Sequence, residues 1–444
     1  MTARPGGTGS SPELAAADRP GLLRGLGRFD AISLTVNSIV GAGVFALPAG
    51  LAIDAGRWSL AVILVAFAVV AVLALSLAEV ASRYDVTGGP QVYAGLALGP
   101  LTGFTVGWLF TVSRFASYAL IAHVMLDYAA ALWPAFAEPW PRAVAITLFT
   151  SFLTVINLRG VTHGAWVGNL LTIAKMLPLV AIALAGLWFA GWNNLPVTEP
   201  RQPEGIADAL QLALFACIGF DAIAIVAGEM RNPRRDLAVS ILGGLGISCL
   251  LYLLLMLACF GVLADTAAYE RPLVDVSRAF VGPAGSVLMA IAAVVSCAGG
   301  LALQMLVSPR NIFALGESGD LPRAFVAVHP KWRTPHVDVM VYAAVSWILA
   351  VTGTFKYLLE VFVIARMLAY GSSSLALIVL RRREGPAPVP IPGGTVIAVI
   401  ALAATAVIIG TSTLESMRDV VIVLAVGLAI RAAVRRFSPA TGGQ

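Results

Sequence analysis

Residues 29–48 read FDAISLTVNSIVGAGVFALP, an apolar stretch that Gly41 and Gly43 interrupt near its middle. Glycine propagates a helix poorly, so we expect a helix that crosses a membrane here to break at these two residues. In a bilayer, backbone groups freed by such a break are tolerated only where they line a cavity or meet a ligand. Small residues also let two helices pack closely, and this stretch alone fits both explanations.

A second apolar run, residues 207–230, carries a similar interruption. Its middle reads FACIGFD over residues 215–221, which places Gly219 and the carboxylate of Asp221 among apolar side chains, and an ionisable residue at that depth indicates a functional site. The two interrupted runs are the first and the sixth along the chain, so each heads a set of five. Paired interruptions at corresponding positions indicate the binding site of an inverted-repeat transporter. We find no residue-level similarity between the halves, so the repeat is inferred from this layout.

The composition predicts an all-α protein that crosses a membrane many times. Of its 444 residues, 59% are hydrophobic and 12% are charged, about half the charge density of an average soluble domain. Residues 59–78 carry no charge, and at about 1.5 Å per residue they match a bilayer core of about 30 Å. We predict twelve spans, at residues 30–53, 58–82, 92–132, 142–158, 165–190, 207–230, 237–263, 283–315, 337–354, 357–380, 393–411 and 418–434. The third is too long for one upright crossing, so part of it is expected to lie along the membrane surface.

The distribution of basic residues predicts the orientation. Placing the N-terminus in the cytosol puts four basic clusters on the cytosolic side, as the positive-inside rule requires. These clusters are Arg231, Arg234 and Arg235; Arg310, Arg323, Lys331 and Arg333; Arg381, Arg382 and Arg383; and Arg435 and Arg436. We therefore expect a multi-pass protein of the cell membrane (plasma or inner membrane) with both termini in the cytosol, and no nucleic acid partner.

The ends of the chain and its cysteines carry few further signals. Residues 1–28 are rich in Gly, Pro and Arg and contain no apolar segment, so we expect a disordered cytosolic tail and no signal peptide. Residues 435–444 are expected to form a short cytosolic tail. The four cysteines lie inside apolar runs, without the spacing of a metal site or a disulfide framework. We expect no metal, no other cofactor and no disulfide-linked partner chain.

The two breaks predict how a substrate is held. The second half of a broken helix exposes N–H groups, which attract an anion, and the first half exposes carbonyl groups, which attract a cation. A zwitterionic α-amino acid carries both charges on one carbon. We predict that its carboxylate binds the N–H groups of Gly41, Ala42 and Gly43. The carbonyl groups predicted to meet its ammonium are those of Ile39, Val40, Phe215 and Ile218.

Several motifs occur in the order typical of a known superfamily. They read GAGVF (41–45), EVASRY (79–84) with GGP (88–90), IGFD (218–221) with GEMRNP (228–233), and LPR (321–323) with VHP (328–330) and TPH (334–336). In this set the chain resembles the amino acid–polyamine–organocation (APC) superfamily of permeases over residues 28–380.

The resemblance implies the fold named after the bacterial leucine transporter. That fold has a first repeat of five helices, here residues 29–190, and an inverted second repeat of five, here 207–380, with helices 1 and 6 discontinuous. Two further helices, at 392–434, complete the twelve. The resemblance also implies that Phe220, the aromatic residue after the helix 6 glycine, caps the substrate on its outer side. Glu79 and Arg83 are expected to serve the architecture.

A lysine in the fifth span extends the likeness to one subgroup. The Gly-Phe-Asp form of helix 6 is similar to the cationic amino acid transporters and their bacterial proton-coupled relatives, in which such a lysine stands where sodium sits in sodium-coupled relatives. Lys175 lies about ten residues into its span, near the midplane. Burial disfavours the charged ammonium, so we hypothesise that Lys175 carries a coupling proton and contacts carbonyl groups near Asn37 and Val40. Ser296 is expected to complete its hydrogen bonds. A lysine that only reaches the membrane surface is the alternative.

One departure from this subgroup bears on the substrate. The cationic transporters carry a glutamate near the position of Ser113, whereas this chain has Ser113 followed by Arg114. An arginine near the pocket would repel the side chains of lysine and arginine, which favours neutral, small or aliphatic amino acids. Two alternatives stay open: Arg114 as a structural ion-pair partner, and Asp221 as a residue that holds the broken helix rather than the substrate.

The sequence therefore predicts a secondary active transporter that carries amino acids by alternating access, through proton symport. Its expected partners are the amino acid, protons and the lipid bilayer. Amino acid exchange and a cationic amino acid or polyamine permease are the alternatives within this class, and a transporter-like amino acid sensor is the alternative outside it. No nucleophile elbow, metalloprotease pattern or phosphate-binding loop occurs, so an enzyme is not expected.

Overall fold

The computed structural model describes residues 27–84, 89–160, 164–189, 191, 205–225, 230–231 and 233–437. Helices are the regular structure in these ranges, and no β-strand occurs in them. The two predicted tails lie outside the described residues, except where Arg28 begins the first helix and residues 435–437 end the last one.

The helices fall into two stretches of chain. The first stretch contains α1 (Arg28–Ile39), α2 (Gly43–Asp54), α3 (Ser59–Ala81), α4 (Pro90–Leu98), α5 (Pro100–Ala129), α6 (Pro139–Arg159) and α7 (Gly164–Phe189). The second contains α8 (Gly205–Cys217), α9 (Asp221–Ile225), α10 (Pro233–Val262), α11 (Pro272–Val281), α12 (Pro283–Glu317), α13 (His336–Thr352), α14 (Phe355–Glu384), α15 (Gly394–Gly410) and α16 (Leu414–Phe437). Several of them begin at a proline, whose fixed φ suits the first helical position and whose missing N–H is not needed there.

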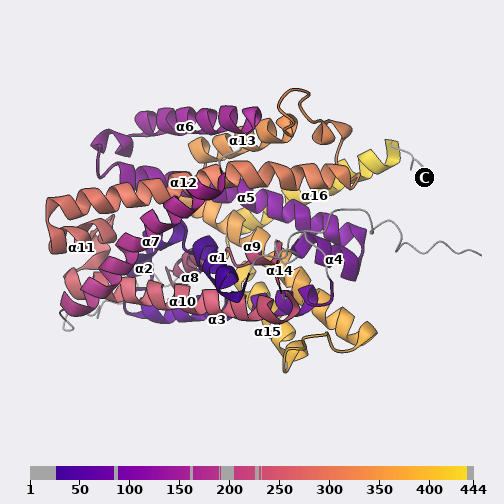
Figure 1. Cartoon of the computed structure of the whole chain (residues 1–444), viewed down its shortest axis with the longest axis horizontal. Coiled ribbons are helices and arrows are strands. Elements are labelled where there is room, and N and C mark those ends of the chain that lie inside the picture. The colour runs from indigo at the N-terminus through magenta and orange to yellow at the C-terminus, as the bar shows by residue number, and fades with distance from the viewer. Residues whose placement is uncertain are drawn as a thin grey trace, which may run out of the picture.

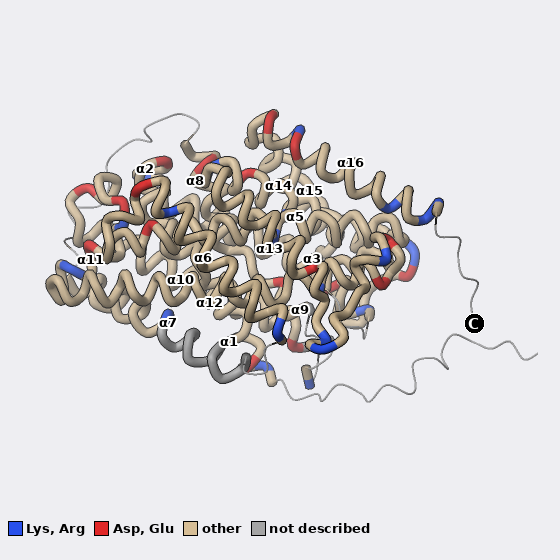
Figure 2. Tube along the Cα trace, turned by 90° about the horizontal axis from the view of Figure 1, so that it is seen from above, with Lys and Arg blue, Asp and Glu red and all other residues tan. Residues whose placement is uncertain are grey.

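Many of these helices can cross a membrane. Seven stretches in the described ranges are long and apolar enough, and the bent pairs α1–α2 and α15–α16 raise the number to nine if each pair is one span. Charged residues gather near the ends of the helices, and long stretches between them carry none (Figure 2). The chain is therefore a polytopic helical membrane protein, while the full count of twelve spans and the inverted repeat stay predictions.

Two local features differ from the predicted spans. The long run at 92–132 forms two helices, α4 and α5, which meet at Gly99 with a φ of 98°. A positive φ of this size is readily adopted only by glycine, so Gly99 marks where the run divides. The second difference is α11, a short helix in the connection after α10 where no element was expected.

The two breaks lie in the middle of the helix bundle. The labels of α1, α8 and α9 fall at the centre of Figure 1, where long helices such as α5, α10 and α12 run along the long axis. Helix α1 packs on α10, α2 on α8, and α14 on both α5 and α3. Because these neighbours surround the breaks, the freed backbone groups are turned towards protein rather than lipid, as a bilayer requires.

Candidate functional site

The first break separates α1 from α2. The two helix axes differ by 52°, and Val40 leaves the helical conformation with a ψ of 80°. The N–H of Gly41 donates to Ile39 O at 2.8 Å, so this turn already uses one of the three predicted donors. The N–H groups of Ala42 and Gly43 make no hydrogen bond within the described part of the chain. They lie at the N-terminus of α2, where the helix dipole attracts an anion.

The second break separates α8 from α9. Residues 218–220 form a turn, and Gly219 adopts a φ of 146°, a conformation that side chains other than hydrogen rarely permit. Among the described residues, nothing donates a hydrogen bond to the carbonyl groups of Val40, Phe215 or Ile218. Three of the four carbonyl groups predicted to meet an ammonium therefore have no donor, and the fourth, Ile39 O, already accepts from Gly41.

The two breaks touch each other. A Cβ added to Gly43 would lie 2.5 Å from Ala216 Cα, and one added to Gly219 would meet the carbonyl oxygen of Ser38. The hydroxyl of Tyr252 lies 3.1 Å from Ile39 O and 3.0 Å from Ala216 O, so one phenol joins the two broken helices. The sequence left two explanations open for the glycines, a helix break and close helix packing. Both apply, because glycine ends the helices and also lets the two backbones approach.

Lys175 lies against the first break. Its Nζ donates to Asn37 O at 2.8 Å, in the last turn of α1, near the carbonyl groups where we expected it. The expectation for Ser296 is wrong in this structure, because its buried Oγ makes no hydrogen bond in the described ranges. Its neighbour Cys297 is the residue within electrostatic range of Lys175. Consecutive residues of a helix point about 100° apart, so a helix that turns Cys297 towards the lysine turns Ser296 away.

Asp221, the first residue of α9, joins the second break to α14. Its carboxylate forms an ion pair with Arg366 at 3.2 Å and accepts a hydrogen bond from the Tyr370 hydroxyl at 2.7 Å, and all three side chains are buried. The Phe220 ring lies 4.8 Å from the Tyr370 ring. These contacts tie the start of α9 to α14, which fits the use of Asp221 as a residue that holds the broken helix, and its role stays a prediction. Phe220 is fully buried here, and its role as a cap on the substrate stays a prediction.

Sequence reasoning missed Arg366 and Tyr370. The signal was present, because Arg366 and Glu360 are the charged residues inside the predicted span at 357–380, and such residues mark functional or structural sites. Residues four apart lie on one face of a helix, so Arg366 and Tyr370 together reach Asp221. The guanidinium of Arg366 also lies over the Phe110 ring of α5, 4.4 Å from its centre.

Arg114 lies beside this pair without joining it. It follows Phe110 by one helical turn on α5 and is within electrostatic range of Arg366 and Asp221. In the described part of the chain its guanidinium makes no hydrogen bond and no ion pair, and its Nε is buried. The structural ion-pair role considered for Arg114 is therefore taken by Arg366. We call Asp221, Arg366 and Arg114 the central cluster.

Ser113 does not add a polar group to this cluster. Its Oγ donates to Phe110 O at 2.8 Å, within its own helix. A serine that bonds to the preceding turn of its helix satisfies its hydroxyl locally. Where the cationic transporters carry a glutamate, this chain therefore has a serine that supplies no carboxylate to the central cluster.

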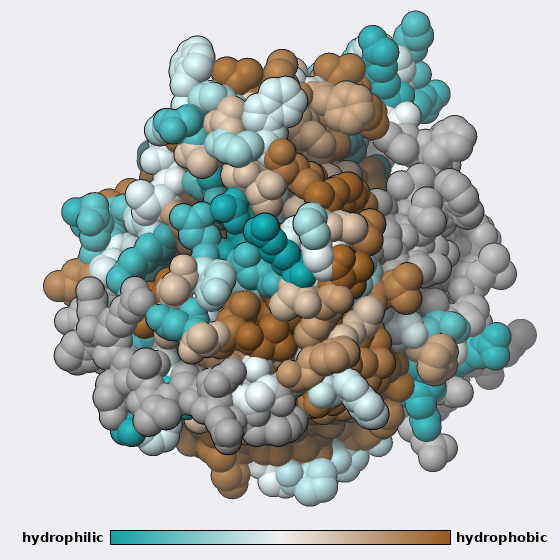
Figure 3. All heavy atoms as spheres, turned by 90° about the vertical axis from the view of Figure 1, so that its left-hand side faces the viewer, coloured by the Kyte–Doolittle hydropathy of each residue, from teal (hydrophilic) through white to brown (hydrophobic). Residues whose placement is uncertain are grey.

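A cavity of about 610 Å³ opens beside the breaks. Its lining includes Asp54 of α2, Asp208 of α8, Asp127 of α5 and Lys356 of α14. On the face at the left of Figure 1, hydrophilic residues gather in the middle, and apolar residues lie to their right and below them (Figure 3). None of the residues predicted to bind the substrate lines the cavity. No group of three His, Cys, Asp or Glu side chains in the described ranges could hold a metal ion.

Two of the residues that line the cavity, Phe45 and Tyr128, form a packed pair of aromatic rings. The hydroxyl of Tyr128 donates to Phe45 O at 3.0 Å, and the two ring centres are 5.3 Å apart. At its outer part, Lys356 forms an ion pair with Asp208 at 2.6 Å, which ties α14 to α8.

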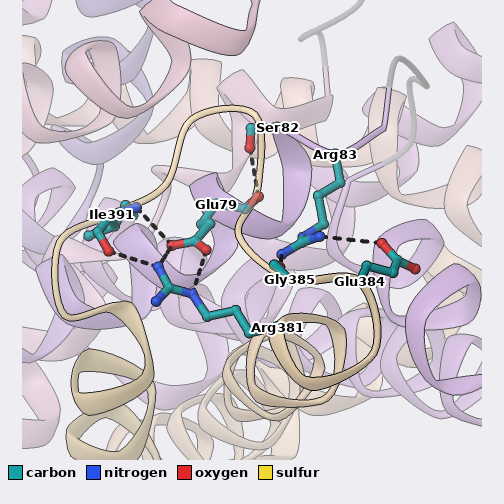
Figure 4. A network of polar contacts seen from close by, with 7 residues as sticks. All are labelled: Glu79, Ser82, Arg83, Arg381, Glu384, Gly385 and Ile391. Atoms are coloured by element: carbon teal, nitrogen blue, oxygen red, sulfur yellow. Dashed lines mark hydrogen bonds and ion pairs between the residues drawn. The ribbon is translucent and has the colours of Figure 1, made fainter.

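A second charged cluster lies at the other end of α14 (Figure 4). Arg381 donates to both carboxylate oxygens of Glu79 at 2.7 Å, and Arg83 pairs with Glu384 at 3.3 Å. The backbone takes part too, since the Ile391 N–H donates to Glu79 at 3.0 Å. We call Glu79, Arg83, Arg381 and Glu384 the end cluster. Its bonds join α3 to α14 and to the α14–α15 connection, the kind of architectural role expected for Glu79 and Arg83.

Comparison with known proteins points to one family. A sequence model described as amino acid permease matches residues 26–430. A Mycobacterium tuberculosis protein named as an uncharacterized transporter is 30% identical, over 88% of this chain and 89% of its own. The serine/threonine exchanger SteT of Bacillus subtilis is 27% identical, over 82% of this chain and 84% of its own. The branched-chain amino acid permease BcaP of the same organism is 27% identical over 84% of each chain.

Proposed function

The chain belongs to the amino acid permease family, and from this premise we propose that it is a secondary active transporter that holds its substrate between the two helix breaks. It transports amino acids and is not an enzyme. We further propose that it works by alternating access in the cell membrane, with the termini in the cytosol and the cavity between α2 and α8 facing outwards.

The observation that carries this proposal is the contact between the two breaks. Among the described residues, the N–H groups of Ala42 and Gly43 have no acceptor, and they lie at the same pair of breaks as three carbonyl groups that have no donor. An α-carboxylate satisfies the first set and an α-ammonium satisfies the second. Because backbone groups provide both contacts, the site recognises what all α-amino acids share, and the choice of side chain is left to neighbouring residues.

The proposed substrates have side chains without a positive charge, small aliphatic ones among them. The guanidinium of Arg114 lies beside the second break and forms no ion pair with any described residue, so it would repel a lysine or arginine side chain. Two of the relatives support this choice, because they are named for serine and threonine and for branched-chain amino acids.

Lys175 is the proposed carrier of the coupling proton. When charged, its ammonium makes a strong hydrogen bond to Asn37 O and so holds α7 to the end of α1. Loss of the proton weakens this bond and frees α1 to move relative to α7. Exchange is the second candidate mechanism, favoured by the name of the serine/threonine exchanger, and in that case the lysine has a structural role.

Uptake into liposomes distinguishes these mechanisms. The purified protein is reconstituted, and uptake of radiolabelled amino acids is measured with and without an inward proton gradient, into empty vesicles and into vesicles preloaded with amino acid. Gradient-stimulated uptake of alanine or serine into empty vesicles supports proton symport. Uptake only into preloaded vesicles identifies an exchanger. Absence of uptake of every amino acid under both conditions contradicts the proposed function.

A further inference from the structure

The central cluster contains more positive than negative charge. It has two guanidinium groups, those of Arg366 and Arg114, and one carboxylate, that of Asp221. The carboxylate is already bonded to Arg366 and to the Tyr370 hydroxyl. Asp221 is also the carboxylate that interacts with the charge of Arg114. Within the described ranges one positive charge of this cluster therefore has no counter-charge of its own, an arrangement that low-dielectric surroundings make costly.

The uncompensated charge lies next to the proposed substrate site. Phe110, one turn before Arg114, contacts the Arg366 guanidinium and lies 5.8 Å from the Tyr370 ring. Tyr370 in turn packs on Phe220, which belongs to the turn between α8 and α9. A substrate held at that turn therefore has the central cluster as its neighbour.

The side chain of Arg114 can accept an additional ligand. A guanidinium presents five N–H donors in a planar fork that matches the two oxygens of a carboxylate. In the described part of the chain none of these donors is used, and the residue is only partly buried. Its backbone is held in place, because the Tyr342 hydroxyl of α13 donates to Arg114 O at 3.1 Å.

We propose that Arg114 binds the side-chain carboxylate of an acidic amino acid, so that the transporter prefers an anionic side chain to its neutral isostere. This inference rests on the proposed function and extends its substrates from uncharged to acidic side chains. With such a substrate bound, the central cluster holds two guanidinium groups and two carboxylates, the same balance that the end cluster has within the chain itself.

Pairs of substrates that differ in charge but hardly in shape test the proposal. Uptake of glutamate is compared with that of glutamine, and uptake of aspartate with that of asparagine, in reconstituted liposomes. Hydrogen bonds to a charged group contribute about 1.5–3 kcal/mol, which corresponds to about a ten- to hundredfold preference for the acid. Equal or better uptake of the amides by the unmodified protein overturns the proposal while leaving amino acid transport intact.

Two variants show whether Arg114 causes the preference. Arg114→Gln is expected to bring the ratio of acid to amide uptake to about one while amide uptake continues, and Arg114→Lys, which keeps the charge, is expected to retain part of the preference. The matched control is Arg418→Gln, because Arg418 lies on α16 with an exposed side chain, and its ratio should equal that of the unmodified protein. An unchanged ratio in properly folded Arg114→Gln contradicts the proposal.

The counter-charge could also come from a free inorganic anion. The same uptake measurements are therefore repeated with gluconate in place of chloride. Amide uptake that persists without chloride agrees with a substrate carboxylate as the ligand of Arg114. Amide uptake that requires chloride assigns the position to an inorganic anion, and the proposal is then wrong. Failure of every amino acid in all conditions instead contradicts the proposed function.

Discussion

Helix α14 carries an arginine–carboxylate cluster at its middle and another at its end, and the two differ in charge balance. The end cluster pairs two arginines with two carboxylates, and backbone groups such as the Ile391 N–H complete its bonds (Figure 4). The central cluster has two arginines for one carboxylate. Both clusters consist of arginines and carboxylates, so they differ in how many carboxylates the folded chain places beside the two arginines.

The end cluster is balanced in charge, whereas the central cluster carries one more positive charge than negative charge. In the end cluster every charge meets an opposite charge of the chain, which joins α3 and α14 without need of a ligand. In the central cluster the guanidinium of Arg114 forms no ion pair with a described residue. It lies beside the broken helices, where the carboxylate of a substrate would supply the anion. A surplus charge at the centre of a membrane protein therefore indicates a binding position, whereas a balanced network at a helix end indicates architecture.

The largest effect is expected from removing the only carboxylate of the central cluster. Asp221→Asn leaves the buried guanidinium of Arg366 and the partly buried one of Arg114 without the carboxylate of this cluster, which is expected to cost about 3–5 kcal/mol of folding stability. The yield of monodisperse protein and its Tm in detergent measure this loss. Adding Arg366→Gln to Asp221→Asn should restore part of it, because the second change removes one of the two unpaired charges. Full stability of the single variant would contradict the described ion pair.

A smaller loss is expected in the end cluster. Glu79→Gln leaves Arg381 without its carboxylate, but the Arg381 side chain is 20% exposed and can turn towards water. We therefore expect a loss of about 1–3 kcal/mol, seen as a lower Tm in the same detergent. Transport by the protein that remains folded should keep its choice of substrate. A change of substrate preference in Glu79→Gln would break the distinction between the two clusters.

Lys175 is a third central cation, and it bonds a neutral carbonyl rather than a carboxylate. Lys175→Ala is expected to lower proton-driven uptake at least about tenfold, equivalent to about 1.4 kcal/mol, because no group is left to carry the proton. Exchange between preloaded vesicles and medium should continue, which also shows that the variant is folded. Proton-driven uptake that survives in a normally folded variant would disprove the coupling role.

The smallest change in folding stability is expected from substituting Arg114, which forms no ion pair with a described residue. Arg114→Gln should change stability by less than about 1 kcal/mol, because no hydrogen bond or ion pair of the described chain is broken. The matched change in the end cluster, Arg381→Gln, leaves the buried Glu79 carboxylate unpaired and should lower the Tm clearly. Equal losses in the two variants would show that Arg114 is a structural partner after all.

The sequence by itself determined where the helices lie and where two of them break. The predicted run at 142–158 corresponds to α6 at Pro139–Arg159, and Gly41, Gly43 and Gly219 mark the observed breaks. These features follow from local properties, since apolar length sets a helix in a bilayer and glycine weakens it. The run at 92–132, which is too long for one upright crossing, divides into α4 and α5 at Gly99, a residue that the sequence already shows there.

Only the tertiary structure decided which polar groups meet. Asp221 and Arg366 lie 145 positions apart, and nothing local to either residue shows that they pair. The same holds for Ser296 and Arg114, because in the described part of the chain the Ser296 hydroxyl and the Arg114 guanidinium make no hydrogen bond. Side-chain directions become fixed when helices pack against one another, so the choice of partner, and with it the uncompensated charge at the centre, is a property of the folded chain.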